Sequence, residues 1–184
     1  MNILIVFATT EGQTGKIARR AAGHVSRKAH HVDVIDSEEP GALPDWENYD
    51  AVILAGSVHQ ERHQDSLINF VIAHREQFNS LPSALISVSL SAATDDGRPA
   101  AQKYVERFLW ITKLQPVRTL LLAGALRYSQ YEYFKVEIVK HIVSKTAGTF
   151  EQTGDHEFTD WNALSQFLDK FLDQVAQSRA SRAE

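Results

Sequence analysis

FATTEGQTGKIARR, residues 7–20, begins with the apolar end of a strand pattern and continues as a helix pattern. Three threonines, a glycine, a glutamine and the acidic Glu11 lie between the two. Ile17, Ala21 and Val25 then repeat at the spacing of one helix face. A polar turn between a strand and a helix is typical of the edge at which α/β folds bind their ligands.

The rest of the chain places this turn in a doubly wound α/β fold. Apolar, β-branched runs alternate with helix-like patterns, which predicts a five-stranded parallel sheet with strand order 2-1-3-4-5. The buried strands are predicted at 2–7, 51–56, 84–90 and 119–126, and the alternating run 31–36 is typical of an edge strand. Beyond the first helix, helices are predicted around 67–72, from Pro99 to Thr112 and over 161–175, the last one capped by Thr159. The connection 37–50 shows no helix pattern.

One segment is too long for this minimal fold. Residues 128–158 separate the fifth strand from the last helix, where about 2–6 residues would suffice. We interpret them as an insertion after strand five, with an amphipathic helix that ends at Gly148. The prediction is therefore a single domain over 1–178, followed by a frayed tail at 179–184.

Composition limits the chemistry. A chain of 184 residues with 43% hydrophobic residues can fill one core, and the absence of cysteine excludes disulfides, thiolate metal sites and thiol nucleophiles. Eight histidines are scattered without the spacing of a metal site, so no metal is predicted. The net charge of −4 argues against nucleic acid as a partner. The chain has no membrane-spanning run and no signal pattern, and a cytoplasmic location is expected.

The opening turn is predicted to hold a phosphate group. Its successive backbone N–H groups and the positive end of the following helix favour an anion, and the threonine hydroxyls add donors. A Walker loop and a dinucleotide fingerprint are both absent. Like charges about 4 Å apart repel by about 4 kcal/mol at an effective dielectric of 20, so the Glu11 carboxylate is expected to face solvent. The expected contacts are Thr9, Thr10, Glu11, Gly12, Gln13 and Thr14; the alternative is a capped helix start with incidental threonines.

The stretch FATTEGQTGKIA resembles the FMN-phosphate loop of flavodoxins, with Glu11 at a position where these proteins usually have threonine or serine. The segments PDWENYDAVILAGS, LPSALISVSL, LLAGALRYSQY and FTDW further resemble the bacterial flavodoxin-like protoporphyrinogen dehydrogenases. This resemblance covers nearly the whole chain. It implies non-covalent FMN, oxidation of protoporphyrinogen IX to protoporphyrin IX in haem biosynthesis, and a membrane quinone as electron acceptor.

In such a fold the flavin ring would meet the ends of the third and fourth strands. The ring contacts implied here are Ser57, Val58, His59, Ser87, Val88, Ser89 and Leu90. Flavodoxins usually flank the ring with an aromatic side chain, and neither segment contains one. His59 is a catalytic candidate near the ring; it can also be an exposed loop histidine without a role.

Arg127 is the second catalytic candidate, because a guanidinium suits a substrate propionate; a surface ion pair is the alternative. Lys135, Lys140 and Lys145 lie beside an apolar stripe in the insertion, which fits peripheral attachment to the inner face of an anionic membrane. A core-packing helix with a solvated lysine face explains the same pattern.

Two other functions stay open at this point. One is a soluble flavodoxin-type electron carrier, against which stand the missing aromatic residues and the modest charge. The other is a quinone reductase supplied by a nicotinamide, although no second nucleotide motif is visible.

Overall fold

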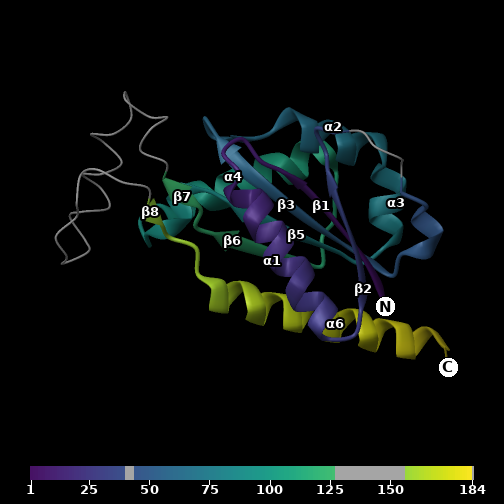
Figure 1. Ribbon diagram of the computed structural model, residues 1–184. Helices are drawn as coiled ribbons and strands as arrows, with labels where there is room; N and C mark the ends of the chain where they lie inside the picture. The colour runs from purple at the N-terminus through teal and green to yellow at the C-terminus, as the bar shows by residue number, and fades with distance from the viewer. Residues whose placement is uncertain (40–43, 127–155, 184) are drawn as a thin grey trace.

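Five parallel strands form the centre of the molecule. The structure, a computed structural model, describes residues 1–39, 44–126 and 156–183. The strands stand side by side in the order β2-β1-β3-β5-β6 (Figure 1), which confirms the predicted 2-1-3-4-5 sheet. Their bounds are β1 (Asn2–Ala8), β2 (His31–Asp36), β3 (Ala51–His59), β5 (Ser83–Val88) and β6 (Arg118–Leu122).

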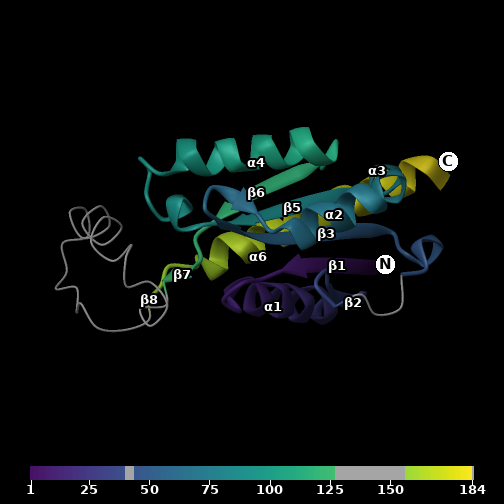
Figure 2. The same cartoon turned by 90° about the horizontal axis from the view of Figure 1, so that it is seen from above.

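Helices cover both faces of this sheet, as Figure 2 shows from above. Alternate residues of β1 face the two layers. Ile3 and Ile5 belong to the core under α1 (Gln13–Arg27) and α6 (Trp161–Ala183). Leu4 and Val6 belong to the core under α2 (Asp65–Ala73) and α4 (Arg98–Thr112). Because both faces are buried, the central strands show continuous apolar runs in the sequence. A further short helix, α3 (Arg75–Ser80), follows α2.

The structure differs from the prediction in several connections. The connection 37–50, predicted without a helix, contains the short 3₁₀ helix η1 (Trp46–Asn48). The third strand continues three residues further than expected and pairs antiparallel with the short β4 (Arg62–His63). The predicted strand 84–90 ends at Val88, and a second 3₁₀ helix, η2 (Leu90–Ala93), follows it.

The last helix starts and ends differently from the prediction. Asp160, rather than Thr159, caps it, because the Asp160 Oδ1 atom accepts from the backbone N–H groups of Asn162 (3.0 Å) and Ala163 (2.9 Å). The helix runs to Ala183 and so includes residues 179–183 of the predicted tail.

The insertion leaves and rejoins the domain at one place. The short strands β7 (Ala125–Leu126) and β8 (His156–Glu157) pair antiparallel there. Residues 127–155, which include Arg127 and the three insertion lysines, lie outside the described part of the chain. Among the described helices, none combines the length and the apolar character that crossing a membrane requires.

Candidate functional site

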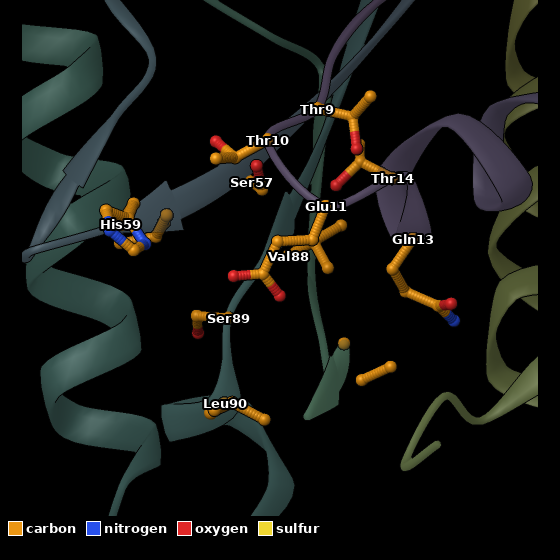
Figure 3. Close-up of a pocket in the computed structure, with 13 residues that line it drawn as sticks. Thr9, Thr10, Glu11, Gln13, Thr14, Ser57, His59, Val88, Ser89 and Leu90 are labelled. Carbon is orange, nitrogen blue, oxygen red and sulfur yellow. The ribbon is translucent and has the colours of Figure 1, made fainter. Parts of the chain in front are cut away.

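A pocket opens at the carboxyl ends of β1, β3 and β5, where the polar turn after β1 faces the ends of the other two strands (Figure 3). It is lined by Thr9, Thr10, Glu11, Gln13, Thr14, Ser57, Val58, His59, Val88, Ser89, Leu90, Gly124 and Ala125. Segments far apart in the chain therefore meet at one edge of the sheet, because parallel strands all end at the same side.

A glycine and two backbone hydrogen bonds fix the conformation of the turn after β1, which faces this pocket. Gly12 has a φ of 85°, in the left-handed region that glycine adopts without strain. Its N–H donates to the Thr9 hydroxyl oxygen at 2.9 Å, and its carbonyl accepts the first helical bond from the Lys16 N–H at 3.0 Å. The N–H groups of the first turn of α1 have no acceptor within the helix, so they are available to an anion.

Two buried hydroxyls at the pocket lack a partner among the described residues. The Oγ1 atom of Thr14 and the Oγ atom of Ser89 are both shielded from solvent, and both residues line the pocket. Burying a hydroxyl without a hydrogen bond costs about 1–3 kcal/mol. Such groups therefore point to a polar ligand that completes them, with an acceptor atom near Thr14.

The Glu11 carboxylate was predicted to face solvent, and the structure contradicts this prediction. The residue is half-buried, and its carboxylate lies among the side chains of the pocket in Figure 3. An anionic ligand bound at the turn would thus have a carboxylate beside it. The positive end of α1 is the local feature that offsets this charge.

Ser87 and Gly12 do not line the pocket, although both were expected to contact the ligand. Ser87 has the same parity along β5 as Leu85, so its side chain faces the layer of α2 and α4. There its Oγ atom lies 3.0 Å from the Nε2 atom of the buried His63. Gly12 contributes through the backbone bonds described above.

His63 is buried in the same layer and packs on Phe108, with ring centroids 4.8 Å apart. Burial lowers the pKa of His63 from 6.5 to about 4, because the charged form would lose its solvation. The imidazole is therefore neutral near pH 7. It supports the strands from behind the pocket and does not line it.

Sequence reasoning missed two parts of the site. Gly124 and Ala125 line the pocket next to β7. Gln64 lies behind it: its Nε2 atom donates to the hydroxyl oxygens of Thr10, at 3.0 Å, and of Ser57. No local pattern marks these residues, because only the tertiary fold brings them to the phosphate turn.

The base of the insertion is fastened to the same turn. The Gln13 Nε2 atom donates to the Thr159 hydroxyl at 2.9 Å, and that hydroxyl donates to the Ala123 carbonyl at 2.9 Å. Lys16 forms an ion pair with Glu157 of β8 at 2.5 Å, and the hydrogen bond from Lys16 holds the pKa of Glu157 below its usual value. The turn, the end of β6 and β8 are thus connected side chain by side chain.

The chemistry available at the pocket is that of hydroxyls, amides and backbone N–H groups. Within the described residues that line it, none is a phenylalanine, tyrosine or tryptophan, and Glu11 and His59 are the titratable side chains. His59 ends β3 at the pocket rim and is exposed. No group of three or more histidine, aspartate or glutamate side chains able to hold a metal occurs in the described ranges.

Comparison with known proteins accounts for this arrangement. The family model described as "Flavodoxin domain" matches residues 4–153. The chain belongs to the flavodoxin family. Within the family it groups with proteins named "Protoporphyrinogen IX dehydrogenase [quinone]". The one from Escherichia coli (strain K12) is 32% identical over 91% of this chain and 92% of the relative, and the one from Leishmania major is 30% identical over 91% and 73%.

Solved structures of flavodoxins share the fold. A flavodoxin of Streptococcus pneumonia TIGR4 superimposes with a TM-score of 0.53 at 14% identity, over 97% of this chain and 99% of the other. The Fusobacterium nucleatum flavodoxin bound to flavin mononucleotide gives a TM-score of 0.51 at 12% identity, over 96% and 98%. At these identities the likeness is one of fold.

Proposed function

We propose that the pocket binds FMN with its phosphate in the turn after β1. The observation that carries this proposal is the buried Thr14 hydroxyl, which lacks a partner among the described residues and lies at the start of α1 in a turn lined by further hydroxyls. A phosphate monoester supplies the acceptor that Thr14 needs, and the first N–H groups of α1 and the helix dipole stabilise its charge. The flavodoxin family supports the same ligand.

The flavin ring would then lie along the edge formed by the ends of β3 and β5. Val58 and Leu90 offer apolar contact from the two sides, and the Ser89 hydroxyl, which is buried without a partner among the described residues, suits a polar atom of the ring. None of the described lining residues is a phenylalanine, tyrosine or tryptophan, so no side chain of these types in the described part of the chain covers the face of the ring. This feature favours an enzyme over an electron carrier.

We further propose that the chain oxidises protoporphyrinogen IX to protoporphyrin IX with a quinone as acceptor, as a step of haem biosynthesis. When bound, FMN would supply the chemistry by accepting a hydride and passing two electrons to a quinone, so the six electrons removed from each porphyrinogen require three such turnovers and three quinones. Support comes from the names of the relatives and from their coverage of nearly the whole chain. We propose a cytoplasmic location for the chain, with a quinone dissolved in the membrane bringing it to the membrane surface as a peripheral protein.

Residues of the chain would orient the porphyrinogen and accept its protons. We propose His59, at the rim of the pocket, as the group that takes the proton leaving the porphyrinogen together with each hydride. Arg127 remains the proposed partner of a substrate propionate.

Anaerobic mixing tests the proposal. Three equivalents of the FMN-loaded chain, each accepting two of the six electrons, should lose their visible flavin absorbance on addition of one equivalent of protoporphyrinogen IX, and porphyrin fluorescence should rise at the same time. A soluble quinone should then restore the absorbance. The carrier function would be favoured instead if the absorbance persists with the porphyrinogen but is lost with a flavodoxin reductase and its nicotinamide.

A further inference from the structure

Gln64 connects two walls of the pocket without lining it. Its side-chain Nε2 atom donates to the Thr10 hydroxyl in the phosphate turn and to the Ser57 hydroxyl at the end of β3. Thr10 and Ser57 both line the pocket and lie side by side in Figure 3. Gln64 is the N-cap residue of α2 and directly precedes its first residue, Asp65.

The β3–β4 hairpin brings Gln64 to this position. The chain reverses at Gln60 and Glu61, whose φ values of 47° and 62° lie in the left-handed region, and Val58 then pairs with His63. The absence of a side chain at Gly56 allows the returning chain to lie close, because a Cβ atom there would stand 2.6 Å from the Leu67 Cδ2 atom.

The direction of these hydrogen bonds decides where the hydroxyl protons go. A hydroxyl whose oxygen accepts from an amide N–H keeps its own proton for another acceptor. Both hydroxyls accept from Gln64, so both protons are free to point into the pocket. The reverse amide orientation would bury two N–H donors without acceptors, whereas the observed one leaves only the Oε1 atom buried without a partner among the described residues.

We propose that Gln64 is a positioning residue that turns the Thr10 and Ser57 hydroxyls into donors toward the cofactor. Thr10 would donate to the phosphate monoester, and Ser57 would donate to an acceptor of the flavin nearer the ring. This inference rests on the proposed FMN site and concerns how the chain selects a phosphorylated flavin over an unphosphorylated one.

The test measures dissociation constants of the cofactor-free chain for FMN and for riboflavin, which has the same ring but no phosphate, by quenching of flavin fluorescence. Gln64→Met removes both donors at nearly constant size. It should weaken FMN binding about 10-fold and riboflavin binding no more than about 3-fold, because the Thr10 hydroxyl is then no longer held as a donor to the phosphate and that bond is a charge-assisted one. Gln64→Glu should lower the preference for FMN further, since a carboxylate accepts both hydroxyl protons and adds a negative charge.

Gln60→Glu is the matched control, because it adds the same charge at the exposed tip of the hairpin. It should change FMN binding by less than about 2-fold, since an exposed charge is screened by salt.

In a Thr10→Val background, Gln64→Met should have no further effect on the preference for FMN. If Gln64→Met does not fold, as judged by thermal unfolding, Thr10→Val carries the test because it removes the Thr10 proton that Gln64 is proposed to direct, and it should lower the preference by a similar factor.

Equal weakening of FMN and riboflavin binding by Gln64→Met, or an unchanged preference in Thr10→Val, would overturn the inference while leaving FMN as the cofactor. A wild-type chain that binds neither flavin would overturn the proposed function and this inference with it.

Discussion

Thr14 is the residue on which the proposed phosphate site depends most. Its hydroxyl is buried without a partner among the described residues, so in the cofactor-free chain it costs stability and in the FMN complex it should donate to the phosphate. Thr14→Val should therefore act in opposite directions on the two states. The cofactor-free variant should unfold at an equal or higher urea concentration, and its FMN affinity should fall about 10- to 100-fold, the equivalent of about 1.5–3 kcal/mol for a bond to a charged group.

Thr112 provides the control for this substitution. It is equally buried, but its hydroxyl already donates to the Phe108 carbonyl at 2.8 Å. Thr112→Val should lose about 1–2 kcal/mol of unfolding free energy and leave FMN affinity unchanged. If both variants have the same effect on FMN binding, Thr14 does not contact the phosphate.

His63 makes the stability of the fold depend on pH. The folded pKa is lowered to about 4 from 6.5, so between these values the unfolded chain binds a proton that the folded chain does not. The free energy of unfolding should therefore fall as the pH falls from 6.5 to 4, by up to about 1.4 kcal/mol per pH unit from this group.

Urea denaturation at about pH 7 and about pH 5 measures this dependence. His63→Gln, which cannot be protonated in this range, should reduce the loss of stability on acidification. The same loss in wild type and His63→Gln would show that His63 is not the group responsible.

The residues of the pocket divide into those that the sequence could predict and those that it could not. The threonines around Gly12 lie close together in the sequence, so their pattern is visible without knowledge of the fold. Gln64 has no such pattern, because its role depends on a hairpin that returns it to a turn 54 residues earlier in the chain. Ser87 was predicted to contact the ring through its backbone, and strand alternation already puts its side chain on the face of Leu85.

At the scale of elements, the connection between η2 and α4 should tolerate no side chain at Gly97. A Cβ atom there would lie 2.2 Å from the backbone oxygen of Ser91, and backbone cannot move aside as a flexible side chain can. Gly97→Ala should cost about 1–3 kcal/mol of unfolding free energy and weaken FMN binding, because η2 begins with Leu90 of the pocket.

Gly23→Ala is the comparison, because the nearest atom to a Cβ at this position of α1 is the end of the Arg27 side chain at 3.6 Å. It should gain about 0.5–1 kcal/mol from the better helix propensity of alanine. Chemical denaturation of both variants gives the result. An equally small effect of the two substitutions would mean that the η2–α4 connection adapts freely.

Elements with a periodic pattern were predictable, and elements that depend on local backbone geometry were not. The buried strands leave continuous apolar runs because both faces of the sheet are covered. The strand β4 has two residues, Arg62 and His63, and follows left-handed turn residues that are neither glycine nor asparagine. Turn chemistry therefore gave no signal for it.

At the scale of the whole molecule, alternating strands and helices were enough to predict the sheet order, because parallel connections are short and right-handed. Fold alone does not define a substrate, since one fold carries many activities. The step from flavodoxin fold to porphyrinogen oxidation depends on the relatives that match nearly the full chain.

A crystal structure of the chain with FMN is the most direct measurement of the central proposal. It should place a phosphate oxygen about 2.5–3.0 Å from the Thr14 hydroxyl, at the start of α1, with the flavin ring between Val58 and Leu90. An FMN bound elsewhere, or a Thr14 hydroxyl that stays without a phosphate partner at saturating FMN, would contradict it.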